Sequence, residues 1–201
     1  MGRRRTFDEG DVLSAVAPAF WDKGYASTSL DDIMQVSGLG KGSLYAAFGD
    51  KYTIFRRVFD GYCTGVAQST ASALAGPDES ALHRLTAMLQ RAASRNEAQQ
   101  ACFLAKTTAE LAAHDPEVAA RSRQAFEEIA HTIAGCIEQA QRAGDIDAGA
   151  DPRRLGHHIL IVLRGIEALA EAGADAEVLG DAAAVAIESL PRAAHAESAD
   201  R

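Results

Sequence analysis

Apolar residues recur along this chain at helical spacing. Leu30, Ile33 and Val36 follow one another at i, i+3 and i+6, and Leu44 and Phe48 are four residues apart. The composition agrees, because alanine is abundant while aromatic residues and proline are scarce. The pattern predicts an all-α protein with helices over about 6–23, 28–37, 40–48, 50–75, 80–94, 101–113, 116–143, 152–172 and 174–190.

The segment 28–48 predicts two short helices joined by a tight turn. Thr28 is a suitable N-cap and forms a capping-box pattern with Asp31. Gly38 can adopt the left-handed conformation that ends a helix. The second helix, opening at Gly40 or Lys41, carries few apolar residues. Its exposed side chains are small, hydroxylated or aromatic, which favours entry into the major groove of DNA over burial in a core.

The pattern of a helix-turn-helix assigns a chemical role to several of these side chains. Lys41 can bond guanine or a phosphate, Ser43 can bond either, and Ala46 can touch a thymine methyl. Thr28, Tyr45 and Lys51 are placed to hold phosphates. The predicted DNA-binding residues are Thr28, Ser29, Gly40, Lys41, Gly42, Ser43, Tyr45, Ala46 and Lys51.

These motifs resemble the N-terminal domain of the TetR family of bacterial transcriptional regulators, from about Phe7 to Tyr62. The matching pieces are residues 20–25, 28–33, 42–48 and Lys51. The resemblance implies a three-helix helix-turn-helix DNA-binding domain over 4–64. A long fourth helix would join it to a larger helical effector-binding and dimerisation domain over 65–201. Gly40, Ala46 and Ala47 are smaller than the family's usual residues, which leaves the base preference open.

The resemblance also implies partners. A ligand-released homodimeric repressor would bind double-stranded DNA at a pseudo-palindromic operator and answer to an unidentified small-molecule effector. The last two helices would pair with their symmetry mates. The alternative is that they close only the monomer's own core. The apolar residues concerned are Leu155, Ile159, Val162, Ile166, Leu169, Val178, Leu179, Val185, Ile187 and Leu190.

The effector pocket is expected within the body of the protein, lined by its middle helices. Its candidate residues are Met88, Phe103, Thr107, Phe126, His131, His158 and Arg164. Glu110 and His114 are four residues apart, but without a third ligand they predict a solvated surface pair. No metal site and no cofactor are therefore expected.

Charge divides the chain into two parts. The formal net charge is −8, yet the first sixty residues hold eight basic and eight acidic side chains. The acidic remainder would be repelled by phosphate and would orient the molecule with its motif towards DNA. Arg3, Arg4 and Arg5 are either an arm that touches DNA or a solvated tail. No apolar run is long enough to span a membrane, and three scattered cysteines suit the reducing cytoplasm.

Two other functions deserve comparison with DNA-binding regulation. Cys102 opens a predicted helix with Lys106 one turn on, which suggests an oxidant- or electrophile-sensing repressor. A non-enzymatic structural dimer would have little reason to expose Lys41, Ser43 and Tyr45 beside a glycine-rich turn. An enzyme is not indicated, because the sequence has no phosphate loop, nucleophile elbow or metal motif.

Overall fold

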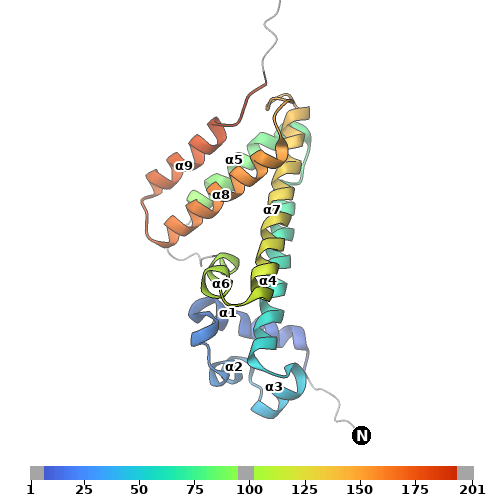
Figure 1. Ribbon diagram of the computed structural model, residues 1–201, viewed down its shortest axis with the longest axis vertical. Helices are drawn as coiled ribbons and strands as arrows, with labels where there is room; N and C mark the ends of the chain where they lie inside the picture. The colour runs from blue at the N-terminus through green and yellow to red at the C-terminus, as the bar shows by residue number, and fades with distance from the viewer. Residues whose placement is uncertain (1–6, 95–101, 194–201) are drawn as a thin grey trace, which may run out of the picture. The chain divides into compact units, whose positions relative to one another are not determined.

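A computed structural model describes residues 7–94 and 102–193, and the prediction of an all-α protein is confirmed. Within these ranges the chain forms nine α-helices and one short 3₁₀ helix at Asp78–Ser80 (Figure 1). The α-helices are α1 Glu9–Ser27, α2 Leu30–Ser37, α3 Lys41–Phe48, α4 Lys51–Leu74, α5 Ala81–Ala93, α6 Phe103–Leu111, α7 Pro116–Arg142, α8 Pro152–Glu171 and α9 Ala176–Glu188.

The helices form two compact units. The first, called here the head unit, extends to Gly65 and also includes Phe103–Ser122. The second, the body unit, contains the chain from Val66 to Cys102 and from Arg123 onwards. Helix α6 and the first turns of α7 therefore belong to the head unit, although they follow residue 65 in the sequence. Helices α4 and α7 each contribute to both units.

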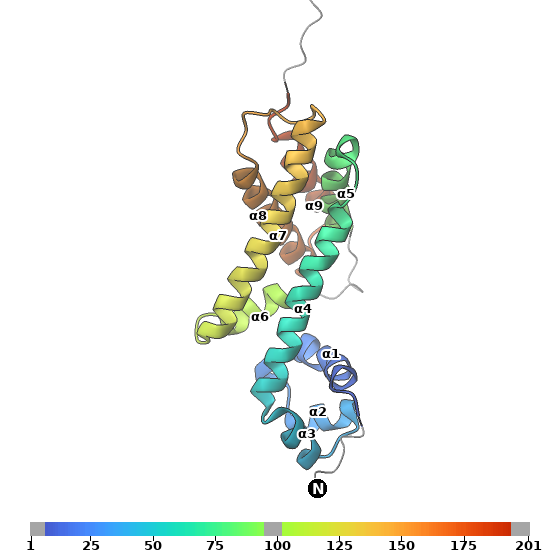
Figure 2. The same cartoon turned by 90° about the vertical axis from the view of Figure 1, so that its right-hand side faces the viewer.

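Aromatic side chains form the core of the head unit. Helices α1 to α3 surround the first half of α4 (Figure 2). Phe20 of α1 and Phe55 of α4 are fully buried, and their rings meet edge to face with centroids 5.4 Å apart. Phe103 of α6 joins the same cluster, lying 5.9 Å from the Phe59 ring. Burial of these rings is the main source of stability available to a unit of this size.

Helix α1 begins after Asp8 and breaks at Gly24, directly after the predicted helix of about 6–23 ends. The predicted start, at about residue 6, lies outside the described residues. The N-cap is Asp8, whose carboxylate accepts hydrogen bonds from the backbone nitrogens of Gly10 and Asp11. Pro18 remains inside the helix, and the non-helical residue is Gly24, with φ +77°. The bend therefore falls at the residue that tolerates a positive φ.

Helices α5, α8 and α9 pack together in the body unit (Figures 1 and 2). Helix α8 begins at Pro152, where the sequence predicts a helix to begin, and Asp151 is its N-cap. Gly156 lets α8 approach α7 closely, because a Cβ atom there would lie 2.8 Å from the carbonyl oxygen of Ala130. Among the described residues, no helix is both long and apolar enough to cross a membrane.

Candidate nucleic-acid interface

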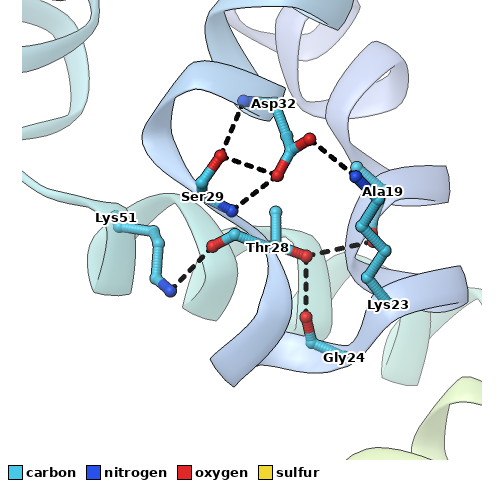
Figure 3. A network of polar contacts seen from close by, with 7 residues as sticks. All are labelled: Ala19, Lys23, Gly24, Thr28, Ser29, Asp32 and Lys51. Atoms are coloured by element: carbon cyan, nitrogen blue, oxygen red, sulfur yellow. Dashed lines mark hydrogen bonds and ion pairs between the residues drawn. The ribbon is translucent and has the colours of Figure 1, made fainter.

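The N-terminus of α2 is held by Ser29 and Asp32, one residue later than the predicted pair of Thr28 and Asp31. The Ser29 hydroxyl accepts a hydrogen bond from the Asp32 backbone nitrogen at 3.0 Å. The Asp32 carboxylate accepts one from the Ser29 backbone nitrogen at 2.8 Å (Figure 3). This is a complete capping box. Ser29 is exposed, but its hydroxyl is committed to the cap.

Thr28 occupies the interior instead of the surface. Its exposed fraction is 0%. Its hydroxyl lies 2.7 Å from the carbonyl oxygen of Gly24 and 3.1 Å from that of Ala19 (Figure 3). The expected phosphate contact therefore does not suit this side chain, because its one donor already serves carbonyls of α1. Thr28 ties the end of α1 to the start of α2.

Lys51 is also directed inwards. Its Nζ atom donates hydrogen bonds to the carbonyl oxygens of Tyr25 and Thr28 at 2.8 and 2.9 Å. The same ammonium lies 4.2 Å from the centroid of the Tyr25 ring, at cation–π distance. A lysine ammonium has three donors, and these contacts use two of them. Lys51, which the sequence pattern presents as a phosphate contact, thus fixes the junction of α1, α2 and α4.

The outer face of α3 carries the other predicted DNA-binding side chains. Leu44 and Phe48 are 1% and 4% exposed and anchor the opposite face of the helix. Tyr45 is 44% exposed, and the Nζ atom of Lys41 lies 5.8 Å from its ring centroid. The exposed residues of this surface, called here the α3 outer face, are Lys41, Gly42, Ser43, Tyr45 and Ala46.

Two glycines leave the start of α3 bare. Gly40 is the N-cap and offers no side-chain hydrogen bond to the first turn. A Cβ atom added at Gly40 or Gly42 would meet nothing within 4 Å. Internal packing therefore does not demand glycine at either position. Backbone amides at a bare helix N-terminus attract anions, and glycine lets a phosphate or a base approach them closely.

A polar clasp between α6 and the end of α1 gives Glu110 and Lys106 other roles than the predicted ones, which were a solvated surface pair with His114 and a cation beside Cys102. The Glu110 carboxylate accepts hydrogen bonds from the backbone nitrogens of Tyr25 and Ala26 at 3.1 and 2.9 Å. Lys106, one turn earlier, donates to the carbonyl oxygens of Trp21 and Asp22 at 3.0 and 3.1 Å. Lys106 and Glu110 are four residues apart, so the sequence places both on one face of a helix. It does not show which backbone groups of α1 they bind.

Two pKa shifts accompany this geometry. The hydrogen bond from Lys23, at 2.6 Å, together with those from Ser29, holds the pKa of the Asp32 carboxyl well below its usual range. Burial, reinforced by the negative charge of Asp50, raises the pKa of Tyr25. Asp32 therefore stays ionised and Tyr25 stays neutral at physiological pH.

The predicted effector residues are divided between the two units. Phe103 and Thr107 belong to the head unit, where both are buried, and Phe103 lines an apolar cleft. His131 lines a groove of the body unit between α7 and α8, about 590 Å³ in volume. The others lie elsewhere in the body unit, with Met88 buried, Phe126 and Arg164 half-buried and His158 exposed.

Cys102 is buried in the body unit, at 7% exposure. The cation beside it is Arg164, whose Nη1 atom donates to the sulfur at 3.0 Å. Lys106, which the sequence places as that cation, instead forms part of the clasp to α1. No group of three or more His, Cys, Asp or Glu side chains is arranged to hold a metal ion within residues 7–94 and 102–193. Arg3, Arg4 and Arg5 lie outside the described residues.

The head unit therefore contains a helix-turn-helix whose second helix presents a polar outer face, which defines a DNA-binding protein. Comparison with known proteins names the family. Residues 12–58 match the model of the bacterial regulatory proteins of the tetR family, and residues 80–186 match that of the tetracyclin repressor-like C-terminal domain. The chain belongs to the TetR family of transcriptional regulators. It is a DNA-binding regulator and not an enzyme.

Several relatives are similar over nearly their whole length. The HTH-type transcriptional repressor ComR of Escherichia coli K12 is 28% identical, with 94% of this chain and 92% of ComR covered. A TetR regulator from Chloroflexus aurantiacus J-10-FL is 26% identical, with a TM-score of 0.78 and 92% and 96% covered. A cysteine mutant of the TetR regulator CifR, solved with a 26 bp double-strand operator, is 23% identical, with a TM-score of 0.76 and 94% and 100% covered. CifR therefore bears on the fold alone.

Proposed function

We propose that this protein is a homodimeric repressor that binds a pseudo-palindromic operator and leaves it when a small effector binds. The observation that carries the proposal is the α3 outer face, which is exposed, polar and supported from behind by Leu44 and Phe48. The name of ComR as a repressor supports the direction of regulation. Within this proposal, residues 4–64 bind DNA, residues 65–201 bind the effector and dimerise, and the protein acts in the cytoplasm.

The proposed DNA contacts come from α3. Lys41 and Ser43 reach base edges, Ala46 touches a thymine methyl, and Tyr45 holds a phosphate. The bare amides at Gly40 and Gly42 approach the DNA backbone. Three predicted contacts take a different role in the proposal, because the polar side-chain groups of Thr28, Ser29 and Lys51 are hydrogen-bonded to other residues of the head unit. They position α3 and do not bind DNA directly.

The dimer surface we propose lies on α8 and α9. Five of the ten apolar residues singled out from the sequence, Ile159 and Ile166 among them, are buried in the body unit and serve its core. The exposed apolar residues follow other helical rows, Ile161 with Leu169 on α8 and Val178 with Val185 on α9. Ile161 and Val185 are 70% and 62% exposed. A group of exposed apolar side chains such as this is typical of a protein–protein interface.

A two-fold dimer accounts for the expected symmetry of the operator. Two copies of α3 would enter successive major grooves, about 34–36 Å apart, and each would read one half-site. The exposed small residues between the apolar ones, such as Ala182 and Gly165, allow helices of two copies to approach closely. Four of the six large apolar side chains exposed in the described part of the chain belong to this surface.

Effector release would work through α7. Glu127 and His131 of this helix line the body-unit groove, where Glu127 lies 3.3 Å from His157 of α8. The same helix begins in the head unit, where the hydroxyls of Ser122 and of Thr108 in α6 are hydrogen-bonded at 2.8 Å. An effector that prefers a different position of α7 would shift the population towards a state with lower DNA affinity.

Selection of bound sequences from a random pool of duplex DNA tests the proposal. We expect a consensus of two inverted half-sites separated by about one helical turn. The affinity for this consensus should fall as salt rises, because phosphate contacts release counterions. A pool with no enriched sequence, or a consensus without inverted symmetry, would contradict the proposal.

A second candidate signal is oxidation or alkylation at Cys102. The observation in its favour is the 3.0 Å contact between the Arg164 guanidinium and the cysteine sulfur. Against it stands the burial of the sulfur. Treatment with N-ethylmaleimide should lower operator affinity in the wild type but not in the Cys102→Ser variant. Unchanged affinity of the alkylated wild-type protein would remove this candidate.

A further inference from the structure

We propose that the head unit contains a second small-molecule site, an apolar cleft between α1 and α4 that takes a small aromatic anion. The cleft has a volume of about 250 Å³. Its lining comes from α1, α4 and Phe103 of α6, so it lies within one compact unit. It is separate from the groove that we assign to the effector, and its occupation does not depend on that assignment.

Small residues create the space. Ser14 and Ala17 lie on the α1 side of the cleft, and Gly61 lies opposite them on α4. Side chains this short cannot fill the gap between the two helices, and a Cβ atom at Gly61 would meet nothing within 4 Å. An engineered cavity of about 150 Å³ already holds benzene, so a cleft of this volume suits one aromatic ring with a short substituent.

Three aromatic rings give the cleft its preference for an aromatic guest. Trp21 and Tyr62 meet edge to face with centroids 4.9 Å apart, and Phe103 lies 5.4 Å from Tyr62 and 6.0 Å from Trp21. Leu13 and Val58 complete the apolar wall. A further ring can add to this cluster by edge-to-face or offset contact, which contributes beyond simple burial.

One cation supplies the charge preference. Arg57 lines the cleft, and its side chain is 41% exposed. Its Nη1 atom donates to the Glu9 carboxylate at 2.7 Å, and its guanidinium lies 5.1 Å from the centroid of the Phe48 ring. A guanidinium has five donors in a planar fork, so it can bind a second carboxylate at the mouth of the cleft. The guest is therefore an aromatic ring with a carboxylate on a short arm.

The position of Arg57 links this site to α3, the helix that we propose enters the major groove. Arg57 belongs to α4, Glu9 to the first turn of α1, and Phe48 to the last turn of α3. A guest carboxylate would share the guanidinium with Glu9 and alter its contact with Phe48. The site thus lies next to Phe48, one of the buried residues that hold the α3 outer face in place.

Titration of the full-length protein with phenylacetate, followed by the fluorescence of Trp21, tests the site directly. Trp21 is the single tryptophan of the chain and lines the cleft, so its emission reports local binding. We expect a saturable change in emission. The neutral isostere phenylacetamide should bind up to about fivefold more weakly, the effect of a partly exposed ion pair. The Arg57→Gln variant should lose this difference between the two compounds.

A matched pair of glycine variants decides the location. Gly61→Leu fills the cleft and should weaken phenylacetate binding by at least about tenfold, with no loss of folding because leucine favours a helix over glycine. Gly65→Leu, one turn further along α4, makes the same change outside the cleft and should leave the affinity unchanged. No saturable change in the wild type, or equal affinity in Gly61→Leu and the wild type, would overturn the proposal. Neither result depends on DNA binding.

Discussion

The Nζ atom of Lys51 lies 2.9 Å from the carbonyl oxygen of Thr28 and donates a hydrogen bond to it. Thr28 itself is fully buried, with its hydroxyl turned towards carbonyls of α1. Two of the three residues that the sequence presents as phosphate contacts are thus bonded to each other and to the backbone of the head unit behind α3. Their importance for DNA binding would come through the position of the reading helix.

This relationship predicts that Lys51→Met destabilises the protein. The substitution leaves the carbonyl oxygens of Tyr25 and Thr28 without their charged donor, so the free energy of unfolding should fall by about 1–3 kcal/mol. Urea denaturation measures the loss. Lys41→Met is the matched control, because Lys41 is exposed and its removal should change stability by less than about 0.5 kcal/mol. Equal stability of the two variants would contradict a structural role for Lys51.

The clasp between α6 and α1 predicts a second stability effect. In Glu110→Gln the side chain loses its charge and one acceptor oxygen, while the backbone nitrogens of Tyr25 and Ala26 both need an acceptor. We expect a loss of about 1–3 kcal/mol, measured by urea denaturation. Glu171→Gln, at the exposed end of α8, makes the same change away from the clasp and should have little effect. A loss no greater than that of Glu171→Gln would contradict the clasp.

The capping box predicts acid sensitivity in the head unit. The folded-state pKa of Asp32 is lowered, chiefly by its hydrogen bond from Lys23, relative to an unfolded value of about 3.9. Its contribution to stability is therefore present above about pH 4 and is lost as the pH falls below that value. Melting temperatures measured from pH 6 to pH 3 should fall less steeply for Asp32→Asn than for the wild type. Parallel curves for the wild type and Asp32→Asn would exclude the effect.

The apolar surface on α8 and α9 predicts that one charge separates the dimer. Val185→Glu places a carboxylate in the proposed interface, where it would be desolvated without a partner. Light scattering should report a monomer for this variant and a dimer for the wild type. Val36→Glu changes another exposed valine, 46% accessible and on α2, and should leave the dimer intact. A dimeric Val185→Glu protein would place the interface elsewhere.

The helical plan could be predicted from the sequence because it depends on local signals. Spacing of apolar residues, Asp151-Pro152 at the start of α8 and Gly38 at the end of α2 each act within a few residues. The predicted N-cap of α2, Thr28, is one residue before the observed one, because both Thr28 and Ser29 are residue types that suit this position. The hydroxyl of Thr28 instead bonds to carbonyl oxygens of Gly24 and Ala19 in the preceding helix, which leaves Ser29 as the cap.

The sequence predicts which face of α3 is exposed, but it predicts less well what each side chain of the candidate site does. The exposed row on α3 follows from helical periodicity, since Leu44 and Phe48 must be buried together. The inward direction of Lys51, and the partners of Lys106 and Glu110, depend on where backbone carbonyls and amides of α1 lie in space. No periodicity or motif encodes those positions. The same holds for Arg164 beside Cys102, which are 62 residues apart.

The operator affinity of Gly42→Ala shows whether the α3 outer face meets DNA. A Cβ atom at Gly42 meets nothing in the protein, and alanine favours a helix, so the variant should fold at least as stably as the wild type. On DNA the added methyl would occupy the space of a close approach. Fluorescence anisotropy with the selected operator should show affinity reduced at least about tenfold. Gly135→Ala, an equally open position on α7, should show none of this loss. Wild-type affinity in a fully folded Gly42→Ala protein would contradict the account.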